Sequence, residues 1–179
     1  MIGVAADTRP GHAVAIATAV GGFLRARGHW DQAAAQYQTA LGAARRASDR
    51  AGQAYALNHL ALVQQLTGDY KPAAAGYLRA LEVFEQLGSE FDRLGQTWAL
   101  DELGRLQHLT GDYPAALATL SRALELHREL GSRHGEIVGL NSLGELAAET
   151  GDAGQARDHH DRALSIAREI GAPPEEARA

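Results

Sequence analysis

The densest cluster of side chains able to bind a metal or transfer a proton is the run Asp-His-His-Asp at residues 158–161. Consecutive residues on a helix point about 100° apart, so this run alone cannot converge on one ion. The other histidines are scattered along the chain, and His127 and His134 are expected on a solvated surface. No metal site is therefore predicted.

Motifs for three common kinds of catalysis are missing. The chain has no glycine-rich phosphate loop ending in Lys-Ser or Lys-Thr, no His-Glu-x-x-His motif and no Gly-x-Ser-x-Gly elbow. Cysteine is also absent, which excludes disulfides, thiolate ligands and cysteine nucleophiles and is compatible with a reducing compartment. The chain is predicted not to be an enzyme and to need no cofactor.

Charge and hydropathy argue against nucleic-acid and membrane binding. The formal net charge is −5, whereas binding to phosphates needs a clustered basic face. The most apolar run, residues 13–24, is shorter than the roughly 20 residues that span a bilayer, and Asp7 stands where a signal peptide would be basic. We therefore expect a cytoplasmic protein. The arginine-rich, lysine-poor composition suggests a GC-rich genome.

A short turn motif organises the rest of the chain. Thr-Gly-Asp-Tyr at 67–70 recurs at 110–113, recurs with a final alanine at 150–153, and has a weaker copy, Gly-His-Trp, at 28–30. The glycines are 40, 43 and 40 residues apart, a period typical of stacked helical repeats. Each glycine is expected to end one helix in the left-handed conformation, and the aspartate, as at Asp69, to cap the next.

Four helical hairpins are predicted around these turns, in a single domain covering residues 1–179. The predicted repeats are approximately 11–47, 51–88, 89–131 and 133–171, between a frayed lead-in at 1–11 and a tail at 172–179. The third repeat is irregular, because the segment 88–111 is three residues longer than 48–68 or 131–151. The extra residues fall around 89–94. They either lengthen a loop or add most of a turn to a helix.

The repeat resembles the tetratricopeptide repeat (TPR) over nearly the whole chain. The family's small residue in the first helix corresponds to Gly21, Ala61, Gly104 and Gly144. Its two alanines in the second helix correspond to Ala33 and Ala40, Ala73 and Ala80, Ala116 and Ala123, and Ala156 and Ala163. The unit of roughly 40 residues, longer than the common unit of about 34, is similar to the long-helix TPR variant of bacterial signal-transduction and transcriptional regulators. This resemblance implies an all-α, right-handed α-solenoid of four hairpins.

The resemblance also implies a concave groove lined by the first helices. When the family's groove positions are carried over to this sequence repeat by repeat, the implied partner-binding residues are Tyr55, Asn58, Gln65, Trp98, Asp101, Arg105, His108, Asn141 and Glu145, with Thr18 in the first repeat. We expect a protein or peptide partner. Asn58 and Asn141 would bond to its backbone, and Tyr55 and Trp98 would anchor apolar side chains. An alternative stays open, in which the central polar row of the groove, Thr18, Asn58, Asp101 and Asn141, bonds only to neighbouring helices or water.

The predicted function is a non-catalytic protein–protein interaction module, the scaffold or sensor part of a bacterial regulator. Two alternatives remain. The last helix, with Ala163, Leu164, Ile166 and Ile170, is expected to leave an apolar face uncovered, so the chain could form a homo-oligomer through its terminal hairpins. The groove could also sense a small ligand, although sequence alone identifies no enclosed pocket.

Overall fold

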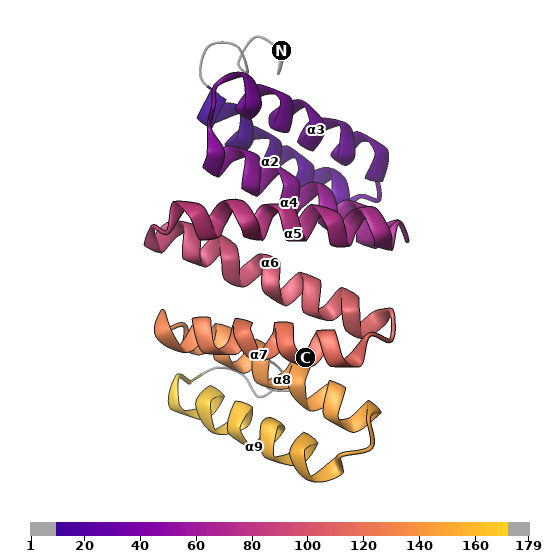
Figure 1. The fold of residues 1–179 in the computed structure, drawn as a ribbon, viewed down its shortest axis with the longest axis vertical. Coiled ribbons are helices and arrows are strands. Elements are labelled where there is room, and N and C mark those ends of the chain that lie inside the picture. The colour runs from indigo at the N-terminus through magenta and orange to yellow at the C-terminus, as the bar shows by residue number, and fades with distance from the viewer. Residues whose placement is uncertain (1–9, 172–179) are drawn as a thin grey trace. The chain divides into compact units, whose positions relative to one another are not determined.

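The computed structural model describes residues 10–171, without the side chains of 10–15 and Thr18. The predicted tail at 172–179, most of the predicted lead-in, and the expected groove position at Thr18 lie outside the described residues. Within them the chain forms helices joined by short turns, which confirms the all-α prediction (Figure 1). The helices are α2 (Pro10–Ala26), α3 (Trp30–Arg46), α4 (Arg50–Leu66), α5 (Tyr70–Leu87), α6 (Glu90–Leu109), α7 (Tyr113–Glu129), α8 (Arg133–Glu149) and α9 (Ala153–Glu169).

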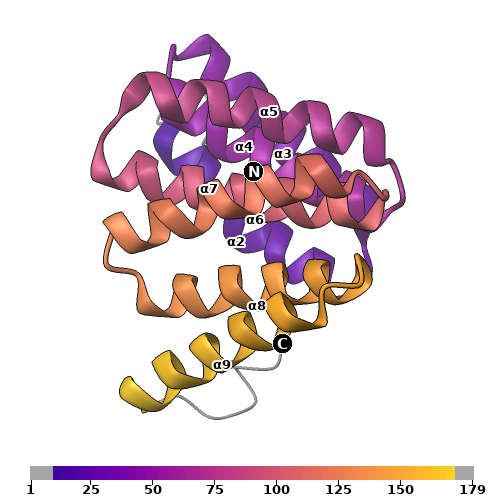
Figure 2. The same ribbon diagram turned by 60° about the horizontal axis from the view of Figure 1, so that its bottom comes forward.

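The chain divides into two compact units, with the boundary inside α6 between Ala99 and Leu100. In the first unit α2 packs on α3 and α4, α3 packs on α4, and α4 packs on α5. In the second unit α8 packs against both α7 and α9, and Figure 2 shows α8 and α9 side by side. That residues 1–179 form one domain stays a prediction. None of the described helices has the length and apolar character needed to cross a membrane.

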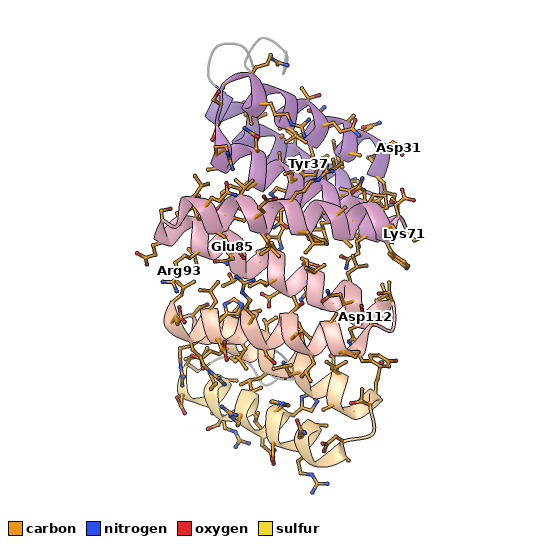
Figure 3. All side chains as sticks on the ribbon, in the orientation of Figure 1. Asp31, Tyr37, Lys71, Glu85, Arg93 and Asp112 are labelled. Carbon is orange, nitrogen blue, oxygen red and sulfur yellow. The ribbon has the colours of Figure 1, made fainter. Side chains whose placement is uncertain are left out.

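Close helix contacts depend on small residues at the register position predicted for them. A Cβ atom added to Gly21 would lie 2.4 Å from Cζ of Tyr37, a ring that lies inside the first unit (Figure 3). A Cβ atom added to Gly104 would lie 2.6 Å from Cγ of Leu120 in the second unit. Because Tyr37 and Leu120 are 2% and 0% exposed, these contacts lie in the apolar cores of their units.

The turn glycines adopt the predicted left-handed conformation, with φ of +86° at Gly68, +80° at Gly111 and +87° at Gly151. The expected cap by Asp69 is wrong, however, since this aspartate forms no side-chain cap hydrogen bond. The aspartates Asp112 and Asp152 do cap, and each accepts from the amide three residues further on.

Proline chemistry explains this difference between the turns. Three residues after Asp69 stands Pro72, which has no amide hydrogen to donate. In the next repeat the proline is one position earlier, at Pro114, so the amide of Ala115 still donates to Asp112 Oδ1 at 3.3 Å. A shift of one residue in the proline therefore removes one helix cap.

The three extra residues of the third repeat lengthen a helix. Helix α6 has 20 residues, whereas α4 and α8 each have 17, which confirms the second of the two predicted alternatives. A capping box starts the longer helix, because the amide of Asp92 donates to Ser89 Oγ at 3.2 Å and the amide of Ser89 donates to Asp92 Oδ2 at 3.3 Å. The added turn leaves Phe91 66% exposed.

The first prediction concerns the missing cap. We expect Pro72→Ala to supply the amide that Asp69 lacks, and thus to be about 1 kcal/mol more stabilising in the native chain than in an Asp69→Ala background. The unfolded-chain entropy of proline is common to both backgrounds and cancels. Urea unfolding followed by circular dichroism measures the difference. Equal effects in the two backgrounds would show that the lost amide is not the cause.

Candidate partner-binding site

A pocket of about 530 Å³ opens in the second unit, where the end of α6, the following turn, the start of α7 and one face of α8 meet. This polar pocket is lined by Arg105, His108, Leu109, Thr110, Gly111, Tyr113, Glu145 and Glu149. Three of these residues, Arg105, His108 and Glu145, belong to the predicted groove. The structure therefore brings together the predicted positions of two first helices, α6 and α8.

The turn between α6 and α7 positions the aromatic wall of the polar pocket. The hydroxyl of Thr110 donates to the Leu106 carbonyl at 2.9 Å and closes α6. Gly111 then reverses the chain, and Tyr113 becomes the first residue of α7. As a result the ring centroids of Tyr113 and His108 lie 6.0 Å apart.

The basic residue of the polar pocket has a partner of opposite charge, whereas one of its acidic residues has none among the described residues. Arg105 is paired with Glu102, a buried carboxylate one turn earlier on α6. His108 Nε2 lies 2.9 Å from Glu149 Oε2, although without the orientation of a hydrogen bond, and the hydroxyl of Tyr113 donates to that oxygen at 3.5 Å. Glu145 is exposed and forms no hydrogen bond or ion pair with the described residues. Two glutamates one turn apart on α8 repel each other, so the pocket favours a positive charge.

The central row of the predicted groove is buried. Asn58, Asp101 and Asn141 are 0%, 8% and 3% exposed. Asp101 Oδ2 lies 2.9 Å from His127 Nε2, and Asn141 Oδ1 lies 3.4 Å from His160 Nδ1. At these two positions the structure supports the alternative in which the row bonds to neighbouring helices.

The amide of Asn58 differs from the rest of that row. Neither of its side-chain polar atoms has a hydrogen-bonding partner among the described residues. Such a group is unusual, because most buried polar atoms are bonded. Its role in pairing with a bound backbone stays a prediction, which the complete burial of the side chain does not favour.

The expectation that His127 lies on a solvated surface is wrong, since it is only 7% exposed. His127 has in α7 the position that Phe84 has in α5, 43 residues earlier, which is also the distance between the turn glycines. Its ring fits only because residue 135 is glycine, where a Cβ atom would lie 2.0 Å from His127 Nδ1. The repeat register contained the signal for this burial. His134 is exposed, as expected.

Two predicted residues of the first unit, Tyr55 and Gln65, have partners inside that unit. The hydroxyl of Tyr55 donates to the Phe91 carbonyl at 3.1 Å, and its ring packs at 5.0 Å from Phe84. Gln65 accepts from Tyr77 at 3.0 Å. These contacts fix the helix ends and the packing of α4. That Tyr55 anchors a partner stays a prediction.

Trp98 is half-buried and belongs to an aromatic stack in the first unit. Its ring and that of His59 lie edge-to-face with centroids 4.5 Å apart, and His59 stacks on Tyr37 with centroids 4.9 Å apart. Burial in this stack, together with the nearby charge of Arg25, lowers the pKa of His59 to about 4. His59 is therefore neutral at pH 7.

The histidines of the 158–161 run face different neighbours. His160 lies against Asn141 and Gly144, whereas His159 lines a second pocket. In residues 10–171, no three His, Cys, Asp or Glu side chains come together in a group that could hold a metal ion.

The second pocket, of about 370 Å³, lies between α7, α8 and α9. This apolar pocket is lined by Tyr113, Pro114, Leu117, Leu143, Leu146, Ala147, Thr150, Asp152, Gln155 and His159. The sequence pattern did not predict this apolar pocket. The available signal was Leu117, one turn after Tyr113 on the same face of α7. Glu149 was missed as well, although it lies one turn after Glu145.

The last helix does not leave the expected apolar face uncovered. Ala163 and Ile166 are buried in the core of the second unit and Leu164 packs against it, which leaves Ile170 as the one exposed residue of the expected four. The outward face of α9 is charged, as at Arg162. The apolar residues fall on the side of α9 that meets α8, which explains the difference. Formation of a homo-oligomer stays a prediction.

Successive helical hairpins with small residues at their contacts define an α-helical repeat protein. The sequence matches the tetratricopeptide repeat family over residues 13–86 and 92–169. The chain therefore belongs to the TPR family, whose fold is typical of scaffolds for protein–protein interaction. No curated protein matches the sequence.

Solved structures show the same TPR solenoid fold. BtubC (BKLC) from P. vanneervenii is 23% identical, with a TM-score of 0.81 over 92% of this chain and 66% of that chain. The apo form of RapI is 17% identical, with a TM-score of 0.78 over 88% of this chain and 57% of that chain. The nearly identical TPR-like repeats of a Podosopora anserina putative kinesin light chain are 14% identical to this chain, with a TM-score of 0.69 over 94% and 83% of the two chains. This chain thus spans only part of BtubC and of RapI.

The contact between His127 and Gly135 can be tested by substitution. We expect Gly135→Ala to lower the free energy of unfolding by about 1–3 kcal/mol, because the methyl group overlaps the His127 ring. In a His127→Ala background the same change should be stabilising by up to about 1 kcal/mol, since alanine favours helix over glycine.

Gly154→Ala is the matched control in the same unit, where the nearest atom, Asp152 Oδ1, would be 3.5 Å from the new methyl. Urea unfolding measures the four variants, namely Gly135→Ala, His127→Ala, the double variant and Gly154→Ala. A similar cost of Gly135→Ala with and without the His127 ring would contradict this account of the packing.

The buried stack predicts a pH dependence. The His59 ring should titrate with a midpoint of about 4 in the folded chain, against about 6.5 in the urea-unfolded chain. The unfolded chain binds a proton that the folded chain does not, so the contribution of His59 to stability is present above pH 6.5 and is lost as the pH falls toward 4. Carbon–proton NMR of the ring follows both forms. A folded-state midpoint near 6.5 would exclude the buried neutral ring.

Proposed function

We propose that this chain is a non-catalytic interaction module and that a segment of a partner protein binds at the polar pocket of the second unit. One observation carries the proposal. Arg105, His108 and Glu145, which the TPR register assigns to the groove, line an open pocket of about 530 Å³. The other predicted groove residues are buried or engaged in contacts within the chain.

The chemistry of the polar pocket favours binding over catalysis. His108 beside Glu149 has the composition of an acid–base pair, and Thr110 lines the same pocket. The hydroxyl of Thr110 donates to the Leu106 carbonyl, however, and completes the end of α6. It is therefore engaged in helix capping and is not activated by the histidine.

The wider role that we propose is the scaffold or sensor part of a bacterial cytoplasmic regulator. The long repeat and the arginine-rich, lysine-poor composition support this role. In the same proposal the four hairpins form one array, with the polar pocket as its main contact for a partner. Self-assembly has no comparable observation in its favour, since the outward face of α9 is charged.

Site-specific photo-crosslinking in source cells tests this function. A benzoylphenylalanine at Leu109, which is 62% exposed and lines the polar pocket, should crosslink a partner protein. The same group at Leu78, which is 56% exposed and lines neither pocket, is the matched control. Adding Glu145→Lys should reduce the specific crosslink at least about tenfold, through charge repulsion in the pocket.

Two results would contradict the proposed function. One is the same set of crosslinked proteins from both positions, which would indicate nonspecific contact. The other is a specific crosslink at Leu109 that Glu145→Lys leaves unchanged, which would separate binding from the chemistry of the pocket.

A further inference from the structure

The polar and apolar pockets adjoin, because Tyr113 lines both of them. Helix α8 contributes to both, with Glu145 and Glu149 in the polar pocket and Leu143 and Leu146 in the apolar pocket. A side chain in one pocket is thus separated from a side chain in the other by a single tyrosine. This places two subsites of opposite chemistry within reach of one short chain segment.

The apolar pocket is suited to an uncharged, bulky side chain. Its outer wall is Leu117, which is 52% exposed on α7. Burial lowers the pKa of His159, and the charges of Arg162 and His160 lower it further, so the neutral form of the ring is favoured. The Nδ1 atom of His159 has no hydrogen-bonding partner in the part of the chain that the structure describes.

The polar pocket selects the opposite kind of side chain. Arg105 is matched by Glu102, which leaves Glu145 and Glu149 as the excess charge of this surface. Both glutamates lie on the same face of α8, where a cation would relieve their repulsion. An acidic segment would be repelled, and an uncharged small molecule would leave the two carboxylates unmatched.

We propose that the partner segment inserts a basic side chain, arginine or lysine, into the polar pocket and a neighbouring bulky aliphatic or aromatic side chain into the apolar pocket. This inference rests on the proposed function and specifies the partner's chemistry. Coulomb attraction to Glu145 and Glu149 selects the basic residue. Apolar burial against Leu117 and Leu146 selects its neighbour, and Tyr113 sets the separation between the two.

Fluorescence anisotropy with purified chain and labelled glycine–serine peptides tests the inference. The probes carry one arginine, one leucine, or both separated by zero to three serines, and a further set replaces arginine by glutamate. At the best spacing, the peptide with both residues should bind at least about tenfold more tightly than either single-residue peptide, since burying a leucine side chain supports a gain of that size. The glutamate peptides should bind more weakly than all of these.

Two variants assign the binding to the two pockets. Leu117→Ala should remove most of the gain from leucine and leave binding of the arginine peptide unchanged, whereas Glu145→Lys should abolish the contribution of arginine. The controls are Leu78→Ala and Glu82→Lys, exposed residues of the first unit that line neither pocket. Circular dichroism confirms that each variant is folded.

The outcomes separate this inference from the proposed function. Lack of any leucine-dependent gain, or a gain that Leu117→Ala and Leu78→Ala reduce equally, overturns the inference. If the leucine result fails in either way but Glu145→Lys still abolishes arginine-dependent binding, the proposed function stands although the inference is overturned. If the native chain binds none of the peptides, the inference is overturned, and the crosslinking at Leu109 then decides the proposed function alone.

Discussion

The structure depends on the insertion of a large side chain from one helix over a glycine, which has no side chain, on a neighbouring helix. Tyr37 fills the space at Gly21, Leu120 the space at Gly104, and His160 the space at Gly144. A second set of contacts, between Phe84 and Gly95 and between His127 and Gly135, joins the end of one hairpin to the start of the following one. Each contact brings two helix backbones close enough to exclude water, and dispersion and apolar burial then stabilise the pair.

This packing decides which polar residues can reach a partner. The row that contains Asn58, Asp101 and Asn141 lies next to the close contacts and is buried with them. One turn further along the first helices, Arg105 and Glu145 lie at the surface and line the polar pocket. Residues one turn apart share a helix face, so this face of each first helix is buried at one level of the stack and open at the next.

The sequence was sufficient to predict the repeat, its turns, its small residues and the longer third repeat, because these follow from periodicity and from backbone preferences of single residues. The lost cap at Asp69 was also readable, since it depends only on the position of Pro72. Burial of the polar row was not readable, because it depends on how deeply a ring such as His127 enters the neighbouring helix. The apolar pocket lies between three helices, and no single periodic stripe identifies it.

Differences between repeats at the same register position indicate where specificity arises. The position of Arg105 is occupied by Leu62 in the second repeat and by Glu145 in the fourth, whereas Leu66 and Leu109 correspond to Glu149. Leu62 is buried, whereas Arg105 and Glu145 line the polar pocket, and the exposed Leu66 and Leu109 are replaced by Glu149 in the fourth repeat. A repeat scaffold can vary exposed positions such as those of Leu66 and Leu109 with little loss of stability, since they contribute little to the core. In the proposed function, the binding chemistry is therefore concentrated in the last two repeats, where Arg105, Glu145 and Glu149 bring charge to the polar pocket.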